Sequence, residues 1–352
     1  MKQRNQSRSA SVQISELTKI PFIDAKNIGG RVLSNLTFFH DGKWDMWLPT
    51  PNGLHWLRGQ PAEADYFAIT PEGSEDVYVE FLNFMVQRAC WADALDPISG
   101  LQCDIHNLGA SLAKIELFYR ESADKSRNVR RFVSTEIEYV FGVCRSLFDL
   151  LQRTILRIWG RVKLLDKSIK KKNLPESFRK MVMLDRKRMS ATEIAEKWHI
   201  PSTLAEFYFK QGAFFEHLRS WRDEIAHHGR DLSFLFVTER GFAVSADTEP
   251  FCSFGIWNEN HMQKNRLASL RPALAYVITE TLRACEEFTD AIQKIIEFPP
   301  EIVPGFRLYL RGYHNKQLLS MRGCIEECLW WDSEPVGVAN SDSEPLRSAT
   351  SE

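Results

Sequence analysis

Residues 127–165 read RNVRRFVSTEIEYVFGVCRSLFDLLQRTILRIWGRVKLL and contain no proline. Apolar side chains recur there every three or four positions, the spacing that places them on one face of an α-helix. This apolar stripe consists of Phe132, Ile137, Val140 or Phe141, Cys144, Leu147 or Phe148, Leu151, Ile155, Ile158 or Trp159, and Val162. The pattern predicts one long helix, and helices of this length usually span a bundle.

The same periodicity continues on both sides of this segment. It predicts further long helices near residues 103–120, 203–228 and 265–297, and Pro299-Pro300 ends the last of them. Together the four helices predict a mainly α fold, an antiparallel helical bundle.

Strand patterns occur before, between and after the helices. Residues 31–39 precede His40-Asp41-Gly42-Lys43, and Asp-Gly between apolar runs is typical of a hairpin whose turn needs positive φ. A second hairpin is predicted near residues 232–245, and residues 306–310 read as a further strand. The expected organisation is a disordered start (1–12), a small β-rich N-terminal part (13–72), a helical domain (73–298) with the hairpin inserted near 232–245, a C-terminal extension (299–331) and a disordered tail (332–352).

The composition indicates a globular protein. The 352 residues are 44% hydrophobic and 26% charged, which allows a large core and excludes disorder for the bulk of the chain. No apolar run approaches the ~20 residues of a membrane span, and the polar start has no apolar signal region. We therefore expect a cytoplasmic protein without a membrane partner. The net charge of −1 argues against a wholly basic nucleic-acid binder but leaves room for a local basic patch.

Seven cysteines are scattered along the chain without any C-x-x-C pair. This odd number predicts free thiols in a reducing compartment. The sequence has no glycine-rich phosphate loop, no G-x-S-x-G motif and no His/Cys cluster with zinc spacing. We therefore expect neither a cofactor nor a bound metal.

One segment is strongly basic. Residues 161–188 contain eleven Lys or Arg against three Asp or Glu. The segment is interpreted either as a solvated linker or as a patch that contacts phosphates. The candidate RNA-binding residues in it are Lys170, Lys171, Lys172, Arg186, Lys187 and Arg188.

The segment that carries chemistry is Arg222-Asp223-Glu224-Ile225-Ala226-His227-His228-Gly229, which closes the helix predicted near 203–228. It resembles the HEPN superfamily, whose ribonuclease members carry an Arg, four to six residues and then a His at the end of a bundle helix. Asp223 matches the polar residue that the family favours after the Arg. The resemblance covers roughly residues 100–298.

The resemblance implies a metal-independent endoribonuclease that uses the 2′-hydroxyl of RNA as nucleophile and leaves a 2′,3′-cyclic phosphate. His227 would take the proton, because histidine titrates near neutral pH, and Arg222 would bind phosphate oxygens. His228 is the alternative base, and Asp223 is the fourth candidate catalytic residue. RNA is the implied substrate, and an antitoxin or regulatory protein is a further partner if the chain is a toxin or an anti-phage effector.

The spacing of the motif raises a geometric question. Five residues at about 100° each place Arg222 and His227 about 140° apart on a helix, and His228 lies about 120° away on the other side. One chain does not obviously bring these side chains together. We therefore expect a homodimer in which the motifs of two chains share a cleft.

Three alternatives stay open at this stage. The first is a non-catalytic HEPN-like module that binds RNA, a nucleotide or a protein. The second is a helix end at which Arg222 and His227 are only solvated cations that suit the helix dipole. The third is a DNA-binding helix-turn-helix at residues 192–203, but its second helix begins with the apolar and aromatic residues 204–209 and is better interpreted as a core helix.

Overall fold

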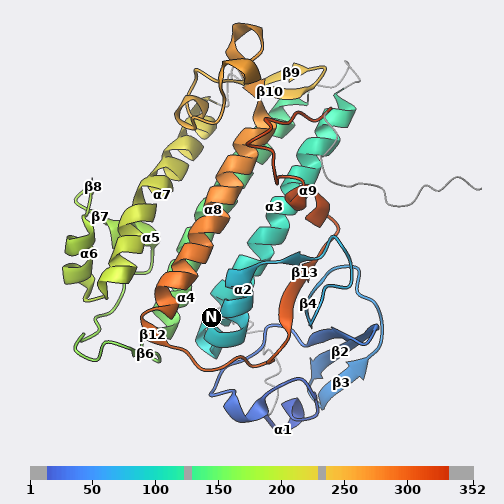
Figure 1. Ribbon diagram of the computed structural model, residues 1–352, viewed down its shortest axis with the longest axis vertical. Helices are drawn as coiled ribbons and strands as arrows, with labels where there is room; N and C mark the ends of the chain where they lie inside the picture. The colour runs from blue at the N-terminus through green and yellow to red at the C-terminus, as the bar shows by residue number, and fades with distance from the viewer. Residues whose placement is uncertain (1–13, 123–128, 229–234, 333–352) are drawn as a thin grey trace, which may run out of the picture.

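The computed structural model describes residues 14–122, 129–228 and 235–332, and for residues 14, 15 and 224–228 it describes the backbone alone. Four long helices lie near the ranges that the periodicity predicts, although the helix predicted at 103–120 begins earlier, at Leu95 (Figure 1). They are α3 (Leu95–Glu121), α4 (Arg130–Trp159), α7 (Ser202–His228) and α8 (Leu270–Gln293). Helix α4 packs against the other three, so its buried face forms the centre of the helical layer.

The apolar stripe of α4 is buried as predicted, except at its first position. Phe132 is 56% exposed and stacks on Phe118 of α3, with ring centroids 5.4 Å apart. The buried side of α4 begins instead with Val133, which is fully covered. One exposed aromatic side chain therefore lies on the outer side of the long helix.

The remaining helices are short. They are α1 (Ile14–Leu17), α2 (Glu80–Phe84), which continues as a π-helical turn over Met85–Ala89, α5 (Phe178–Val182), α6 (Ala191–Trp198) and α9 (Asn315–Leu319). Helix α6 begins with a capping box in which Ser190 and Glu193 satisfy each other's backbone amides.

The prediction of a mainly α bundle with a small β-rich N-terminal part is wrong, because the chain builds a six-stranded mixed sheet beside the helices. Its strand order is β3-β2-β1-β4-β13-β5. The strands are β1 (Thr37–His40), β2 (Lys43–Thr50), β3 (Gly53–Leu57), β4 (Ala64–Ala68), β5 (Val77–Tyr78) and β13 (Arg307–Arg311).

The physical reason for this error is the long-range pairing of β13. This strand comes from near the end of the chain and inserts between β4 and β5, antiparallel to both. No local pattern reports such a pairing, since the two segments are far apart in the sequence. The N-terminal strands and residues 307–311 therefore form one sheet.

Both predicted hairpins form. Asp41 and Gly42 connect β1 to β2 and both have positive φ, 47° and 68°, as a tight turn of this kind requires. The second hairpin joins β9 (Leu235–Thr238) to β10 (Gly241–Ser245), and a third strand, β11 (Leu267–Ser269), pairs with β10. Because β11 takes up residues 267–269, α8 begins at Leu270, later than expected. Two-residue strands form two further pairs, β6 (Lys163–Leu164) with β12 (Ile296–Glu297) and β7 (Met183–Leu184) with β8 (Lys187–Arg188).

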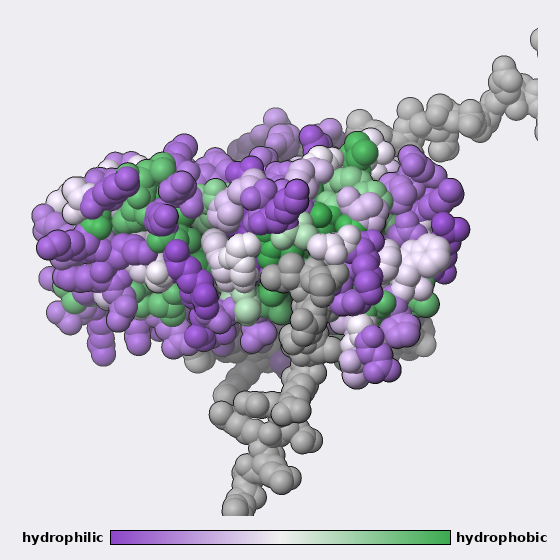
Figure 2. Space-filling model, turned by 90° about the horizontal axis from the view of Figure 1, so that it is seen from below, coloured by the Kyte–Doolittle hydropathy of each residue, from purple (hydrophilic) through white to green (hydrophobic). Residues whose placement is uncertain are grey.

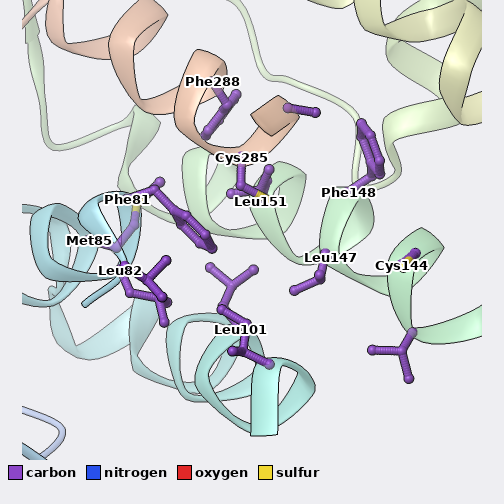
Figure 3. Packing of buried hydrophobic residues seen from close by; sticks show 14 of the residues in the cluster. Phe81, Leu82, Met85, Leu101, Cys144, Leu147, Phe148, Leu151, Cys285 and Phe288 are labelled. Carbon is purple, nitrogen blue, oxygen red and sulfur yellow. The ribbon is translucent and has the colours of Figure 1, made fainter. Parts of the chain in front are cut away.

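Helix α2 joins the sheet to the helices, because it packs against both β13 and α8. Figure 3 shows its side chains facing those of the long helices. The labelled members of this core are Phe81, Leu82, Met85, Leu101, Cys144, Leu147, Phe148, Leu151, Cys285 and Phe288. A continuous apolar core thus supports both the sheet and the helices.

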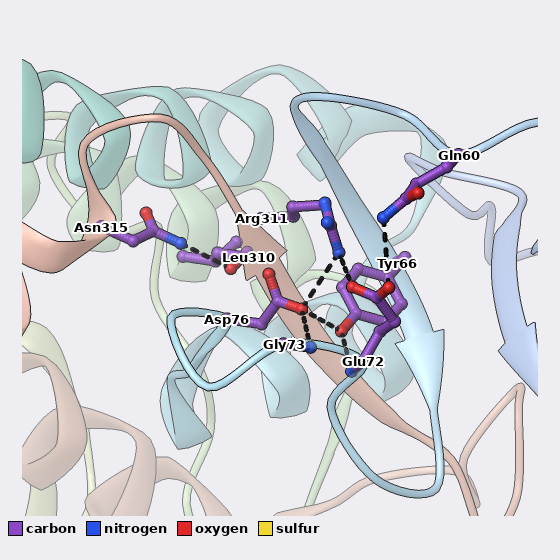
Figure 4. Close-up of polar contacts among 8 residues, drawn as sticks. All are labelled: Gln60, Tyr66, Glu72, Gly73, Asp76, Leu310, Arg311 and Asn315. Atoms are coloured by element: carbon purple, nitrogen blue, oxygen red, sulfur yellow. Dashed lines mark hydrogen bonds and ion pairs between the residues drawn. The ribbon is translucent and has the colours of Figure 1, made fainter. Parts of the chain in front are cut away.

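A polar network fastens β13 to the loop before β5 (Figure 4). The hydroxyl of Tyr66 donates to Asp76 Oδ2 at 2.8 Å and accepts from the backbone N–H of Glu72 at 2.8 Å. Arg311 on β13 forms ion pairs with Glu72 and, at 3.4 Å, with Asp76. Gln60 donates to Glu72 from the far side. The strand from the end of the chain is therefore held by charges as well as by the sheet ladder.

The face seen from below is mostly hydrophilic, with hydrophobic side chains in separate patches (Figure 2). Among the described residues, no helix combines the length and the apolar character needed to cross a membrane.

Candidate functional site

Arg222 lies two turns before the end of α7, next to a residue that anchors this part of the helix. The neighbouring Trp221 is buried, its indole N–H donates to Ser253 Oγ at 3.1 Å, and its ring packs on Phe254 with centroids 4.6 Å apart. Arg222 itself is 37% exposed and lines two adjoining hollows beside α4. The anchored helix thus presents the motif arginine to an open surface.

The first hollow, of about 310 Å³, is rich in arginine. It is lined by Gly142, Arg145, Ser146, Asp149, Leu150 and Arg153 of α4 together with Arg222. Gly142 contributes bare backbone, and a Cβ added there would meet nothing within 4 Å. The absence of a side chain at this position helps to leave the surface open.

In this first, arginine-lined hollow, the positive charges of three arginines exceed the negative charge of the lining carboxylate, Asp149. Among the described residues, neither Arg145 nor Arg153 has a carboxylate within 4 Å, and Arg145 Nε is buried without a hydrogen-bond partner. In the part of the chain that the structure describes, Arg222 has only its neighbour Asp223 as a carboxylate partner, at 3.9 Å. The carboxylate of Asp149 is engaged, because its Oδ1 accepts the backbone N–H of Phe178 at 3.1 Å. Three guanidinium groups around one hollow suit a phosphate or another oxyanion.

The second hollow, of about 470 Å³, has a different character. It is lined by Asp104 of α3, by Thr135, Glu138, Tyr139, Gly142, Val143 and Ser146 of α4, and by Arg222. Burial raises the pKa of Asp104, while hydrogen bonds from Ser146 and Asn107 act in the opposite direction. The Oδ2 atom of Asp104 is buried without a partner. This tyrosine-lined hollow therefore offers an aromatic ring and acceptor oxygens.

The two histidines of the motif are only partly described. His227 and His228 belong to the backbone of α7, but their side chains lie outside the described residues. Asp223 is described, and 47% of its side chain is exposed. The predicted approach of Arg222 to a histidine therefore stays a prediction, as does the shared cleft of a dimer.

Two of the three neighbouring lysines predicted to contact RNA, Lys171 and Lys172, form hydrogen bonds at the C-terminal end of α4. Lys171 Nζ donates to the carbonyl oxygens of Trp159 and Val162, the latter at 2.7 Å, and lies 5.5 Å from the centre of the Trp159 ring. Burial lowers the pKa of Lys171. The carbonyl of Lys172 accepts the Trp159 indole N–H at 2.9 Å. Lys171 thus caps a helix C-terminus, where a cation is favourable, although it is exposed, as are Lys170 and Lys172.

The three other predicted RNA-binding residues lie at the β7–β8 hairpin. Arg186 sits in its turn with φ of 66°, and Lys187 and Arg188 form β8. All three are exposed, and the guanidinium of Arg188 lies 5.4 Å from the centre of the Phe209 ring. None of the six predicted RNA-binding residues lines either hollow beside Arg222.

Reasoning from the sequence missed Arg145, Arg153 and Tyr139, which the fold brings to the same surface as Arg222. The polar side of the long helix α4 could have indicated this surface. Residues at helical spacing on that side line the hollows, namely Thr135, Tyr139, Gly142, Ser146, Asp149 and Arg153.

Two other predictions can be assessed from burial and backbone. Leu204, Ala205 and Tyr208 are fully buried, which confirms that α7 begins as a core helix and not as an exposed recognition helix. All seven cysteines lie in the described part of the chain and are free. Within that part, no three His, Cys, Asp or Glu side chains gather in a way that could hold a metal ion.

Comparison with known proteins gives no relative. No family model, no curated protein and no solved structure matches this chain.

Proposed function

We propose that the arginine-lined hollow binds a phosphodiester of RNA and that the chain is an endoribonuclease acting there through Arg222 and His227. The observation that carries the proposal is the convergence of Arg145, Arg153 and Arg222 on one open hollow, where the first two have no carboxylate partner among the described residues. Guanidinium groups stay charged and match phosphate oxygens in pairs. The resemblance of the motif to the HEPN superfamily supplies the histidine and the reaction.

The proposed reaction is a transesterification within the RNA. His227 takes the proton of the 2′-hydroxyl, and the freed oxygen attacks the adjacent phosphorus while the bond to the 5′-oxygen breaks. The leaving oxygen takes up a proton, so the products are a 2′,3′-cyclic phosphate and a 5′-hydroxyl. Arg222 binds the non-bridging oxygens, on which negative charge builds in the transition state.

The resemblance adds further parts to the proposal. A homodimer would let the His227 of one chain serve the Arg222 of another, which resolves their angular separation on one helix. The cytoplasm would be the place of action, without a metal or a cofactor. A toxin or anti-phage role would require an antitoxin or regulatory protein that restrains the cleavage.

The test is cleavage of an end-labelled RNA by the purified full-length chain in the presence of a chelator. Arg222→Ala should lower the single-turnover rate by a factor on the order of 10² to 10³. Arg322→Ala is the matched control, because Arg322 is exposed and lines neither hollow. Cleavage by Arg222→Ala at the wild-type rate would overturn the catalytic proposal. RNA binding without cleavage by the wild-type chain would favour the non-catalytic alternative.

A further inference from the structure

The tyrosine-lined hollow contains an aromatic ring and carboxylates that the binding of a phosphate does not use. Tyr139 lies on the outer side of α4 and is 44% exposed. The nearest cation over its ring is Lys114 Nζ, 5.8 Å from the ring centre, and within the described residues no other aromatic ring pairs with it. An exposed ring beside a hollow is a surface on which a planar base can stack.

The polar groups of the same hollow include two carboxylates, Asp104 and Glu138, beside three hydroxyl groups and the guanidinium of Arg222. Glu138 has no ion pair or hydrogen bond to the described residues, whereas Asp104 Oδ2 is buried below the surface of the hollow. An ionised carboxylate accepts hydrogen bonds and donates none. A ligand that pairs with Glu138 must therefore bring hydrogen-bond donors to it.

Among the nucleobases, guanine brings the best set of donors. Its N1–H and its exocyclic amine lie side by side and can face the two oxygens of one carboxylate. Adenine and cytosine place an amine next to a ring nitrogen that accepts, and uracil places one N–H between two carbonyl oxygens. A carboxylate repels those acceptors, so pairing with Glu138 favours guanine over the other three bases.

The two hollows are arranged to hold one nucleotide. They share Gly142, Ser146 and Arg222. At 1.5 Å and about 100° per residue, Tyr139 and the shared Ser146 lie on the same side of α4, about 10 Å apart along its axis. A ribose can bridge this separation, with the base at one end and the phosphate at the other.

We propose that the tyrosine-lined hollow binds a guanine base, stacked on Tyr139 with its donors toward Glu138, while the attached phosphate lies among the three arginines. This inference rests on the proposed function, since it takes the arginine-lined hollow as the phosphate site. It goes further by naming the nucleotide that the enzyme prefers beside the cleaved bond.

The test is calorimetric titration of the full-length protein with GMP, IMP, AMP, CMP and UMP in a chelating buffer. GMP should bind at least about tenfold more tightly than UMP, and IMP, which lacks the exocyclic amine, should bind more weakly than GMP. Tyr139→Ala should weaken GMP binding by about fivefold or more, and Tyr139→Phe should restore it. Glu138→Gln should reduce the preference for GMP over AMP while leaving the affinity for inorganic phosphate unchanged.

The outcomes separate this inference from the proposed function. Equal binding of all five nucleotides, with no effect of Tyr139→Ala, overturns guanine recognition and leaves the phosphate hollow standing. GMP preference without cleavage of any RNA supports guanine recognition and contradicts the nuclease. Cleavage that depends on Arg222 but ignores the base beside the cut overturns the inference alone. Thermal melting of each variant distinguishes a lost contact from a lost fold.

Discussion

Asp149 of α4 accepts the backbone N–H of Phe178 through Oδ1 at 3.1 Å, so the carboxylate in the arginine-lined hollow is committed to the start of α5. Asp149 lies one turn from Arg145 and one turn from Arg153, yet it forms no ion pair within 4 Å with either among the described residues. Asp149 thus holds the start of α5 by this hydrogen bond and is not paired with the two arginines one turn away from it.

This arrangement predicts that Asp149→Asn strengthens anion binding. The amide oxygen can still accept the Phe178 N–H, while the loss of one negative charge raises the potential of the hollow. Because the site is open to solvent, the gain in RNA affinity should be on the order of threefold. Filter binding at low ionic strength measures it, and the gain should shrink at high salt. Weaker binding by a variant with an unchanged melting temperature contradicts the phosphate assignment.

Removal of the arginines should change the salt dependence of RNA binding. The double variant Arg145→Ala/Arg153→Ala should bind single-stranded RNA more weakly, with the log–log salt slope flatter by about 0.7 for each lost contact. The comparison is Lys170→Ala/Lys172→Ala, which leaves Lys171 in place as the cap of α4. The arginine variant should show the larger change in slope. An equal or larger change in the lysine variant would assign the phosphate path to the basic segment.

The buried hydroxyl of Tyr66 is expected to stabilise the fold, because it bonds both Asp76 and the backbone of Glu72. Tyr66→Phe leaves Asp76 Oδ2 without this donor and the Glu72 amide without its acceptor (Figure 4). The free energy of unfolding should fall by about 1 to 3 kcal/mol. Urea titration measures it, with Tyr313→Phe as the control because Tyr313 is 66% exposed. An unchanged urea midpoint would mean that the network does not hold β13 in place.

Glu286 on α8 should make the free energy of unfolding depend on pH. Burial raises the pKa of Glu286 to about 7, and the nearby carboxylates of Glu80 and Asp290 act in the same direction. The folded chain therefore holds a proton that the unfolded chain releases near 4.5. Stability from this protonation is complete below pH 4.5 and is lost as the pH rises through 7. Glu286→Gln should thus stabilise the fold at pH 8, by about 1 to 2 kcal/mol after solvent screening.

The measurement for Glu286→Gln is urea unfolding of both proteins at pH 4.5 and pH 8. The difference between variant and wild type should be large at the higher pH and small at the lower one. A difference that is the same at both pH values would show that the carboxyl titrates normally in the folded chain.

The sequence predicts the four long helices and both hairpins, because helical periodicity and turns that contain glycine, Asp41-Gly42 and Arg240-Gly241, are local signals. It does not predict the place of β13, since the pairing of Leu308 with Phe67 depends on two distant segments. The same limit applies to the site. The motif identifies Arg222, but Arg145 and Arg153 look like ordinary solvated arginines until α7 is packed beside α4.

The two histidines of the motif are expected to contribute differently to cleavage, with His227 acting as the base. His227→Ala should lower the single-turnover cleavage rate by a factor on the order of 10² to 10⁴ and leave RNA affinity nearly unchanged, because a base acts on a proton in transit and adds little to ground-state binding. His228→Ala should cleave at close to the wild-type rate. Both are measured in the presence of a chelator, beside filter binding of the same RNA. Cleavage that survives in His227→Ala but disappears in the double variant makes His228 the base, and cleavage that survives in the double variant contradicts histidine as the base altogether.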